Sequence, residues 1–281
     1  MRALAAHNPL HIYFTGRNVA AANTLIADIK SKDPNASLSF IKMDLSSLRA
    51  VKEAIAREFK HDRLDILMNN AGIIAKPAVL STDGYEIQFA TNHLGHAMLT
   101  RELMPILLKT AKEPDADVRI ISNTSAGYEF HRAIKGGISF DELDAASTMS
   151  RMMLGAWIRY GQSKLANILF AAELARRHPE LTSVAIHPGL VKTSMNTEMA
   201  GRSKTFVNVT SRISGEKWLE PHEGVLNQLW CAAGAQKGAL RNGGYYTPGG
   251  VDSTEKLTAE ARDEALSGRL WQWTEHRLLK F

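Results

Sequence analysis

Short apolar segments alternate along this chain with longer segments of helical periodicity. The apolar segments lack the polar-apolar alternation of half-exposed strands, which is typical of strands covered on both faces. Five such strands are predicted, at 10–15, 38–44, 64–68, 118–125 and 182–188. Strands that alternate with helices form parallel sheets with helices on both faces. The pattern therefore predicts a doubly wound α/β fold.

The segments between the strands carry apolar residues at helical spacing. Helices are predicted at 2–6, 18–30, 46–59, 92–108 and 160–177, with a last amphipathic helix near the C-terminus. Pro105 lies inside one of them and is expected to kink that helix without ending it.

Two segments, near 128–159 and 194–220, lose this periodicity and are expected to be loop excursions. Neither is long enough to form a domain. The sequence therefore predicts a single domain over 1–281.

Composition excludes several classes of function. The chain has 34 Lys and Arg against 29 Asp and Glu, with no long basic run, so no nucleic-acid partner is expected. Its one cysteine, Cys231, excludes an internal disulfide framework and suits a cytoplasmic protein in a reducing, intracellular compartment. No run approaches the eighteen apolar residues of a membrane span.

His93 and His96 could bind a metal, but no third ligand is recognisable, so no metal site is expected and the two should pack within a helix.

Tyr160 and Lys164 form the strongest candidate for chemistry. They are one turn apart and can share one face of the predicted helix. The pKa of tyrosine is about 10, but a cation within roughly 4 to 6 Å can lower it by about 1 to 3 units. The pair could thus act as an acid/base unit. The same spacing also occurs as exposed helix decoration, so it is not decisive alone.

Other polar residues stand where predicted strands end. Ser125 ends the fourth strand, at the edge where open α/β sheets bind ligands. Asn70 and Gly72 follow the third strand, and Asn92 opens a helix. Each also has a structural interpretation, as a turn residue or as a helix N-cap.

Taken together, these residues resemble the short-chain dehydrogenase/reductase family. The similarity covers almost the whole chain, and the wording of several motifs is most similar to the retinol dehydrogenase and WW-domain oxidoreductase branch. The motifs are NNAG at 69–72, NHLGH at 92–96, the strand-end Ser125, the Tyr and Lys of YGQSK at 160–164, and HPGLVKT at 187–193.

The resemblance implies a Rossmann-like fold and a role for each matching residue. Tyr160 would be the general acid/base, and Lys164 would lower its pKa and hold the nicotinamide ribose. Ser125 would hydrogen-bond the substrate oxygen. Asn92 would support a proton relay through water.

The resemblance also implies cofactor contacts. Asp44 would contact the adenine, and Asn70 and Gly72 would lie against the adenosine ribose side. Val191 and Thr193 would hold the nicotinamide carboxamide.

Arg17 follows the first predicted strand, where family members that prefer NAD usually have an acidic residue. A guanidinium suits a 2′-phosphate, because it forms charge-assisted and often bidentate bonds. NADP is therefore expected in preference to NAD. The alternative is that Arg17 is a loop charge facing solvent.

One family motif is absent. The family opens with a strand, then Thr-Gly-x-x-x-Gly-x-Gly, then a helix that receives the pyrophosphate. This chain has no such motif, and its similarity begins at RALAAHNPLHIYFTGRN. We therefore expect an N-terminally truncated domain whose first βα unit is missing. A start codon placed too far downstream, a genuine short product with impaired function, and a rebuilt sheet that still works would each explain it.

In the family's sheet the missing strand is central. Its loss would leave an opening about 9.6 Å wide between the first and third strands. Each unpaired buried polar group would cost about 1 to 3 kcal/mol, against total stabilities of about 5 to 15 kcal/mol.

Two classes of function remain open. The first is an NADP-dependent oxidoreductase that transfers hydride between nicotinamide and a carbonyl or secondary alcohol, with a lipophilic small-molecule substrate suggested by the apolar content of the two excursions. The second is a catalytically impaired fragment or a non-catalytic interaction protein of the same fold.

The resemblance also implies a homodimer formed through the helices of Asn92 and Tyr160, although the apolar residues of the latter helix could equally be internal core. Membrane association of a full-length form stays open.

Overall fold

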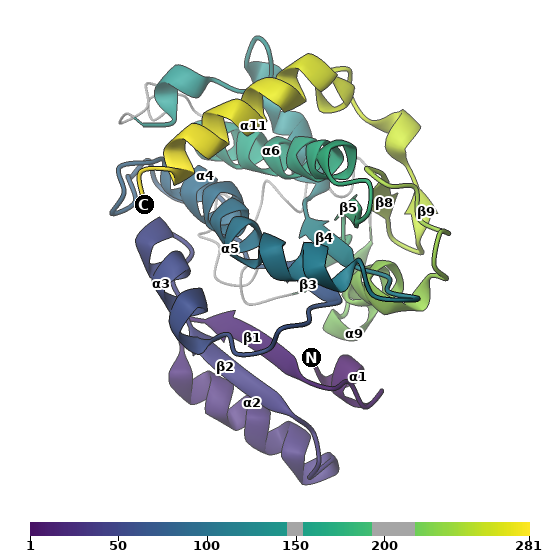
Figure 1. The fold of residues 1–281 in the computed structure, drawn as a ribbon. Coiled ribbons are helices and arrows are strands. Elements are labelled where there is room, and N and C mark those ends of the chain that lie inside the picture. Colours follow the sequence, from purple (N-terminus) through teal and green to yellow (C-terminus); the bar gives the residue numbers. More distant parts are fainter. Residues whose placement is uncertain (145–153, 193–216) are drawn as a thin grey trace.

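The computed structural model describes residues 1–144, 154–192 and 217–281 as a single α/β domain (Figure 1). The strands are β1 (Ile12–Gly16), β2 (Leu38–Lys42), β3 (Ile66–Asn69), β4 (Arg119–Asn123), β5 (Thr182–Ile186), β6 (Leu190–Val191), β7 (Trp218–Leu219), β8 (Tyr245–Thr247) and β9 (Val251–Asp252). The α-helices are α1 (Arg2–Ala5), α2 (Val19–Lys32), α3 (Leu48–Glu58), α4 (Ile87–Phe89), α5 (Gly95–Thr110), α6 (Gly155–Arg177), α9 (Pro221–Gly224), α10 (Leu226–Leu229) and α11 (Glu264–Leu278). The 3-10 and π-helical segments are η1 (Ala90–Leu94), η2 (Ala126–Ala133), η3 (Phe140–Glu142), η5 (Trp230–Gly234), η6 (Thr254–Lys256) and η7 (Glu260–Arg262).

The main sheet has the strand order β3-β4-β5-β8-β9 and is parallel except for the pair β8–β9. Alternate residues of its strands enter two different cores. Ile120 and Ala185 join the large core that also contains residues of α3, α5, α6 and α11, whereas Ile121 and Val184 join a smaller core with η5. The sheet is therefore covered on both faces, as the unbroken apolar strands predict.

The strands β1 and β2 form a separate two-stranded parallel sheet. Within the described residues, no strand pairs with the other edge of β1, and β3 pairs only with β4. This agrees with the expectation that the first and third strands are not neighbours. The apolar residues Ile12, Tyr13 and Phe14 of β1 stay only half-buried.

Side-chain caps set where several helices begin. The Asn18 side chain accepts a hydrogen bond from Ala21 N at 3.0 Å and starts α2. Ser47 caps α3, and Asp83, from a distant loop, accepts from Leu48 N at 2.6 Å. Asp263 accepts from Ala265 N and Leu266 N and starts α11. These residues satisfy amide groups that the first helical turn leaves without partners.

The predicted elements are present, with three differences. The helix predicted at 92–108 begins earlier, because α4, the π-helical turn η1 and α5 follow one another without a break, and α5 continues through Pro105. The helix predicted from Tyr160 begins at Gly155, so the end of the first excursion is helical. In the second excursion, Trp218–Leu219 forms β7 and pairs with β6. Residues 145–153 and 193–216 of the two excursions lie outside the described part.

Within the described residues, none of the helices is at once long enough and apolar enough to cross a membrane.

Candidate active site

The predicted site residues meet where β4 ends beside α6. The Thr124 hydroxyl donates to the backbone oxygen of Lys164 at 2.7 Å. The Lys164 ammonium donates to the oxygen of Asn123 at 3.1 Å, and Asn167 Nδ2 donates to the same oxygen at 3.0 Å. These bonds fix the helix that carries Tyr160 against the carboxyl end of the sheet.

Tyr160 lies against the turn that begins at Ser125. Ser125 Oγ accepts a hydrogen bond from Gly127 N at 3.1 Å and caps η2. A Cβ atom added to Gly127 would lie 2.9 Å from Tyr160 Cε1 and 3.4 Å from Ser125 Oγ. A side chain at this position would therefore press on the Tyr160 ring. A hydrogen bond with Ser125 is also one of the influences on the pKa of Tyr160.

The protonation states of Tyr160 and Lys164 are set chiefly by burial. Burial raises the pKa of Tyr160 to about 12, and the Ser125 hydrogen bond opposes this rise. Burial lowers the pKa of Lys164 to about 8. Lys164 Nζ lies 5.8 Å from the centre of the Tyr160 ring. The lowered phenol pKa expected from the Tyr-Lys spacing is thus not found: loss of hydration is the largest influence on the pKa of Tyr160, and the charge of Lys164 is not among the influences.

Asn92 faces the loop that follows β3. It lies in η1, is fully buried, and its side-chain oxygen accepts from Ile73 N at 2.8 Å. Its amide nitrogen donates to Ile73 O at 3.0 Å and to Ser163 Oγ at 2.9 Å. The amide of Asn92 therefore connects the loop after β3 to α6, close to Tyr160 and Lys164.

Gly72 lies between these groups. A Cβ atom at this position would lie 3.1 Å from Asn92 Oδ1 and 3.3 Å from Lys164 Nζ. Asn70, two residues earlier, accepts through Oδ1 from Gln228 at 2.8 Å and from Asn123 Nδ2 at 3.2 Å. The structure thus brings together the candidates that follow β3 with those of β4 and α6.

Arg17 and Asp44 lie elsewhere, at the carboxyl ends of β1 and β2. Arg17 is exposed, and Asp44 accepts from the amide and the hydroxyl of Ser46 at 2.9 and 2.8 Å. No hydrogen bond or ion pair within the described part joins either residue to the cluster around Tyr160. The segment after Asp44 does reach the helix of Asn92, because a Cβ atom at Gly95 would lie 2.2 Å from Leu45 O.

Val191 ends β6 and packs closely on α9, where a Cβ atom at Gly224 would overlap its side chain. Thr193, its predicted partner, lies outside the described residues.

An apolar cluster surrounds Tyr160. Trp157 is buried beside it, with ring centres 6.3 Å apart and an edge-to-face arrangement. Half-buried apolar side chains from four further segments pack against this pair: Ile74, Ala75, Phe130, Leu190 and Trp218. Two of them, Phe130 and Trp218, come from the predicted excursions.

His93 and His96 are packing residues, as expected. His93 Nε2 is 2.9 Å from Thr274 Oγ1, and its ring meets those of Phe89 and Phe170 edge to face. His96 Nδ1 is 2.9 Å from Asn92 O. Burial lowers the pKa of His93 to about 3 and that of His96 to about 4, so both are neutral at pH 7.

Five polar residues of the site were not predicted: Asn123, Thr124, Ser163, Asn167 and Gln228. Ser163 and Asn167 lie three and seven residues after Tyr160, a helical spacing that could have placed them on its face. Gln228 is distant in sequence from Asn70, and no local pattern indicates that contact.

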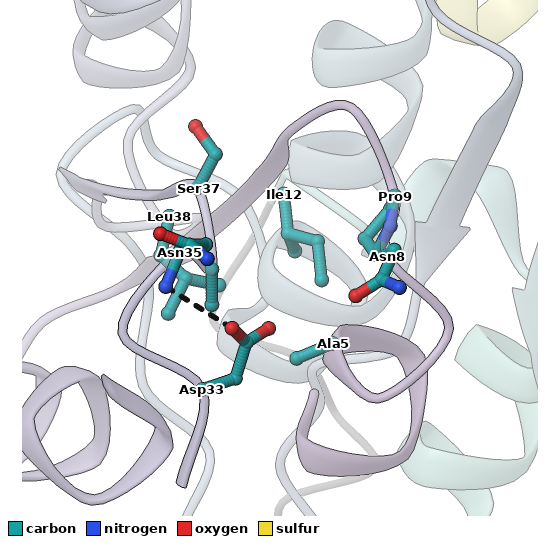
Figure 2. A pocket seen from close by; sticks show the side chains of 9 residues that line it. Ala5, Asn8, Pro9, Ile12, Asp33, Asn35, Ser37 and Leu38 are labelled. Carbon is teal, nitrogen blue, oxygen red and sulfur yellow. Dashed lines mark hydrogen bonds between the residues drawn. The ribbon is translucent and has the colours of Figure 1, made fainter. Parts of the chain in front are cut away.

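A cavity of about 280 Å³ lies away from this site (Figure 2). It is lined by the end of α1 and the segment that follows it, by Ile12 and Leu38 at the first positions of β1 and β2, and by the turn between α2 and β2, where Asp33 accepts from Asn35 N. It therefore lies at the opposite end of β1 and β2 from Arg17 and Asp44, and it contains no predicted site residue.

Comparison with known proteins gives consistent matches. The sequence profile described as "short chain dehydrogenase" matches residues 2–133. "Short-chain dehydrogenase/reductase drtF" of Aspergillus calidoustus is 34% identical, over 99% of this chain and 88% of the relative. Human "Retinol dehydrogenase 14" is 33% identical, over 83% of this chain and 65% of the relative. Among solved structures, an NADPH-bound carbonyl reductase from chicken fatty liver has a TM-score of 0.59 at 21% identity and covers 88% of each chain, which supports the fold.

Proposed function

The chain belongs to the short-chain dehydrogenase/reductase family of oxidoreductases, and we propose that it is an NADP-dependent enzyme that interconverts a carbonyl and a secondary alcohol. The observation that carries this proposal is the arrangement of the half-buried Ser125 with the buried Tyr160 and Lys164 at the carboxyl edge of the sheet. A nicotinamide dinucleotide, when bound, supplies or accepts the hydride.

The residues of the chain would handle the proton. Because burial keeps Tyr160 protonated at neutral pH, its phenol can donate a proton to a carbonyl oxygen during reduction. The Ser125 hydroxyl can donate a hydrogen bond to the same oxygen. The Lys164 ammonium would stabilise the phenolate that forms. Asn92 holds the loop backbone at Ile73 in place beside them.

The described residues fit the nicotinamide and ribose part of such a cofactor. An ammonium has three donors, and within the described part of the chain Lys164 donates only to Asn123 O. Its other donors are free to bind ribose hydroxyls. Gly72 lets the loop backbone lie close to Lys164 and Asn92, because a Cβ atom there would crowd their polar atoms. Val191 and Thr193 would hold the carboxamide, and Asn70 and Asp44 the adenosine half.

Arg17 supports NADP over NAD. It is exposed and has no ion pair within the described residues, so its guanidinium is available for a 2′-phosphate. Arg17→Glu should weaken NADPH binding and leave NADH binding less affected, as measured by quenching of protein fluorescence. Equal loss for both nucleotides would contradict the assignment.

The apolar cluster around Tyr160 supports a lipophilic substrate. Trp157, Phe130 and Trp218 would bury an apolar body next to the phenol, and such surfaces are typical of small-molecule sites.

Turnover tests the proposal directly. The chain is incubated with NADPH and a panel of aromatic and aliphatic aldehydes and ketones, and the absorbance of the nicotinamide is followed. We expect reduction, with higher kcat/KM for the more apolar carbonyls. Binding of NADPH without turnover of any carbonyl or alcohol would refute this function.

A second candidate function is a catalytically impaired fragment or a non-catalytic interaction protein. It is favoured by the absence of the glycine-rich motif and by the separate β1–β2 sheet. Titration with NADPH discriminates, because this candidate predicts no binding at micromolar concentration.

We also propose a cytoplasmic location, supported by the single, buried and unpaired Cys231. A homodimer stays a proposal, to be tested by light scattering. The apolar residues Leu165, Ile168 and Leu169 are not available for it, since they are buried in the core that α6 shares with α11.

A further inference from the structure

A buried ion pair lies next to the site and has no part in the proton transfer described above. Arg159 immediately precedes Tyr160 in α6, and Glu86 caps α4, six residues before Asn92. Arg159 Nε donates to Glu86 Oε1 at 3.2 Å, and the two side chains are only 3% and 4% exposed. Adjacent residues of a helix point about 100° apart, so Arg159 faces Glu86 while Tyr160 faces Ser125.

The pair connects three segments of the site. Arg159 Nη2 donates to Lys76 O at 3.0 Å, at the end of the loop after β3. Glu86 Oε2 accepts from Phe89 N at 2.7 Å, in the helical run that continues to Asn92. A second hydrogen bond joins the same two helical segments, because Gln88 Nε2 donates to Ala156 O at 3.0 Å. These hydrogen bonds therefore join the loop after β3, the helical run that contains Asn92 and the first turns of α6.

The loop held in this way has a strained backbone. Ala75, between Ile74 and Lys76, has φ +50°, a left-handed conformation that residues with a Cβ atom rarely adopt. Such a conformation persists only when surrounding bonds impose it. The bond from Arg159 to Lys76 O is adjacent to this residue. Ile74 and Ala75 in turn pack against Trp157 and Tyr160.

Stability alone does not explain the pair. Buried ion pairs can often be replaced by apolar residues of similar volume without loss of stability. Arg159 Nη1 is in addition buried without a hydrogen-bond partner in the described part, which is costly. What the pair provides is a defined direction for each bond, because the planar guanidinium donates in a fixed geometry.

We propose that Glu86 and Arg159 are positioning residues, which hold the loop 72–76 against α6 so that Gly72, Asn92 and Tyr160 keep their separations. The proposal rests on the function proposed above, since it assigns the pair a purpose in that same site. Neither residue touches the reacting atoms.

The test uses the double variant Glu86→Leu/Arg159→Met, which replaces the pair by apolar side chains and leaves no unpaired buried charge. We expect a melting temperature close to that of the wild type and a kcat lower by about ten- to a hundredfold, because a misplacement of about 1 Å can have this effect. Arg159→Lys, which keeps the charge but loses the planar donors, should recover only part of kcat. Glu173→Gln, which alters a buried carboxylate of α6 thirteen residues beyond Tyr160, is the matched control and should leave kcat unchanged.

A measurement without turnover separates this proposal from the proposed function. In protein labelled with [ζ-¹³C]tyrosine, the signal of Tyr160 is identified by its loss in Tyr160→Phe. We expect it to shift in the double variant and not in Glu173→Gln. A double variant with an unchanged Tyr160 signal and an unchanged kcat would overturn the positioning role. So would a second result, in which Arg159→Met lowers both kcat and the melting temperature and the double variant restores both. If the wild type turns over no substrate, the proposed function fails, and the Tyr160 signal alone decides the role of the pair.

Discussion

The chemistry proposed for this protein depends on one buried phenol. Tyr160→Phe removes the hydroxyl and keeps the ring that packs on Trp157. We expect turnover to fall by about 10²- to 10⁴-fold, the usual contribution of general acid/base catalysis, while NADPH binding stays largely intact. Steady-state kinetics and fluorescence titration measure the two effects. Tyr246→Phe, in which the lost hydroxyl accepts from Arg241 N, is the control and should keep its turnover. Equal turnover in Tyr160→Phe would remove the assigned role.

Lys164 should make the stability of the protein depend on pH. Burial lowers its pKa from 10.5 to about 8, so below pH 8 a charged ammonium is buried at a cost. Between about pH 8 and 10.5 the unfolded chain binds this proton and the folded protein does not, so the contribution of Lys164 makes the free energy of unfolding rise with pH. Lys164→Met should therefore stabilise the protein by on the order of 1 to 3 kcal/mol at pH 7, and by less at pH 9.5.

Urea denaturation at the two pH values measures this difference. Lys109→Met is the control, since Lys109 is exposed and pairs with Asp62 on the surface. Its effect should stay near or below about 1 kcal/mol. A gain for Lys164→Met that is equal at both pH values would show that the lysine does not titrate in this range.

At the scale of elements, the path of the chain from β2 to α3 depends on a glycine in the helical run of Asn92. A Cβ atom at Gly95 would lie 2.2 Å from Leu45 O, which is backbone and cannot move aside cheaply. Gly95→Ala should therefore destabilise the protein by about 1 to 3 kcal/mol, although alanine favours helices.

Gly268→Ala in α11 gives the matched comparison. A Cβ atom there meets nothing within 4 Å, so helix propensity alone should stabilise the protein by about 0.5 to 1 kcal/mol. Opposite signs for the two variants in thermal or urea unfolding are expected. A stabilised Gly95→Ala protein would contradict the close packing of Leu45 on α5.

At the scale of the molecule, the β1–β2 sheet and the main sheet should differ in local stability. Ile12 N donates to Ser37 O at 2.9 Å, so the alternate amides of Tyr13 and Thr15 point to the other side of β1, away from β2. No described strand lies on that other side. Strand β4, by contrast, is paired on both sides. Amides of 12–16 should therefore exchange with deuterium much faster than those of 119–123. Exchange read by mass spectrometry or NMR checks this, and equal protection of the two strands would show that β1 has a further partner.

Much of this arrangement could be predicted locally. Unbroken apolar runs located the five strands, because both faces of a parallel sheet are buried and leave a continuous signal in the sequence. The spacing of Tyr160 and Lys164 placed them on one helical face, and Ser125, Asn70 and Gly72 follow strands whose carboxyl ends share one edge. Two kinds of difference remain: boundaries moved, as at the start of α6, where residues 155–159 are helical although their pattern is weak, and the short strand β7 lies in a segment predicted to be a loop.

What the sequence determined by itself is thus the order of strands and helices, the family, and the residues that stand at the ends of the strands, since all of these depend on neighbours along the chain. The tertiary structure decided what depends on distant segments. It set Asn92 against Ile73 and joined Glu86 to Arg159. It also reversed the direction expected for the pKa of Tyr160, because the hydration of a phenol is removed by the segments that pack around it and not by its helical neighbours.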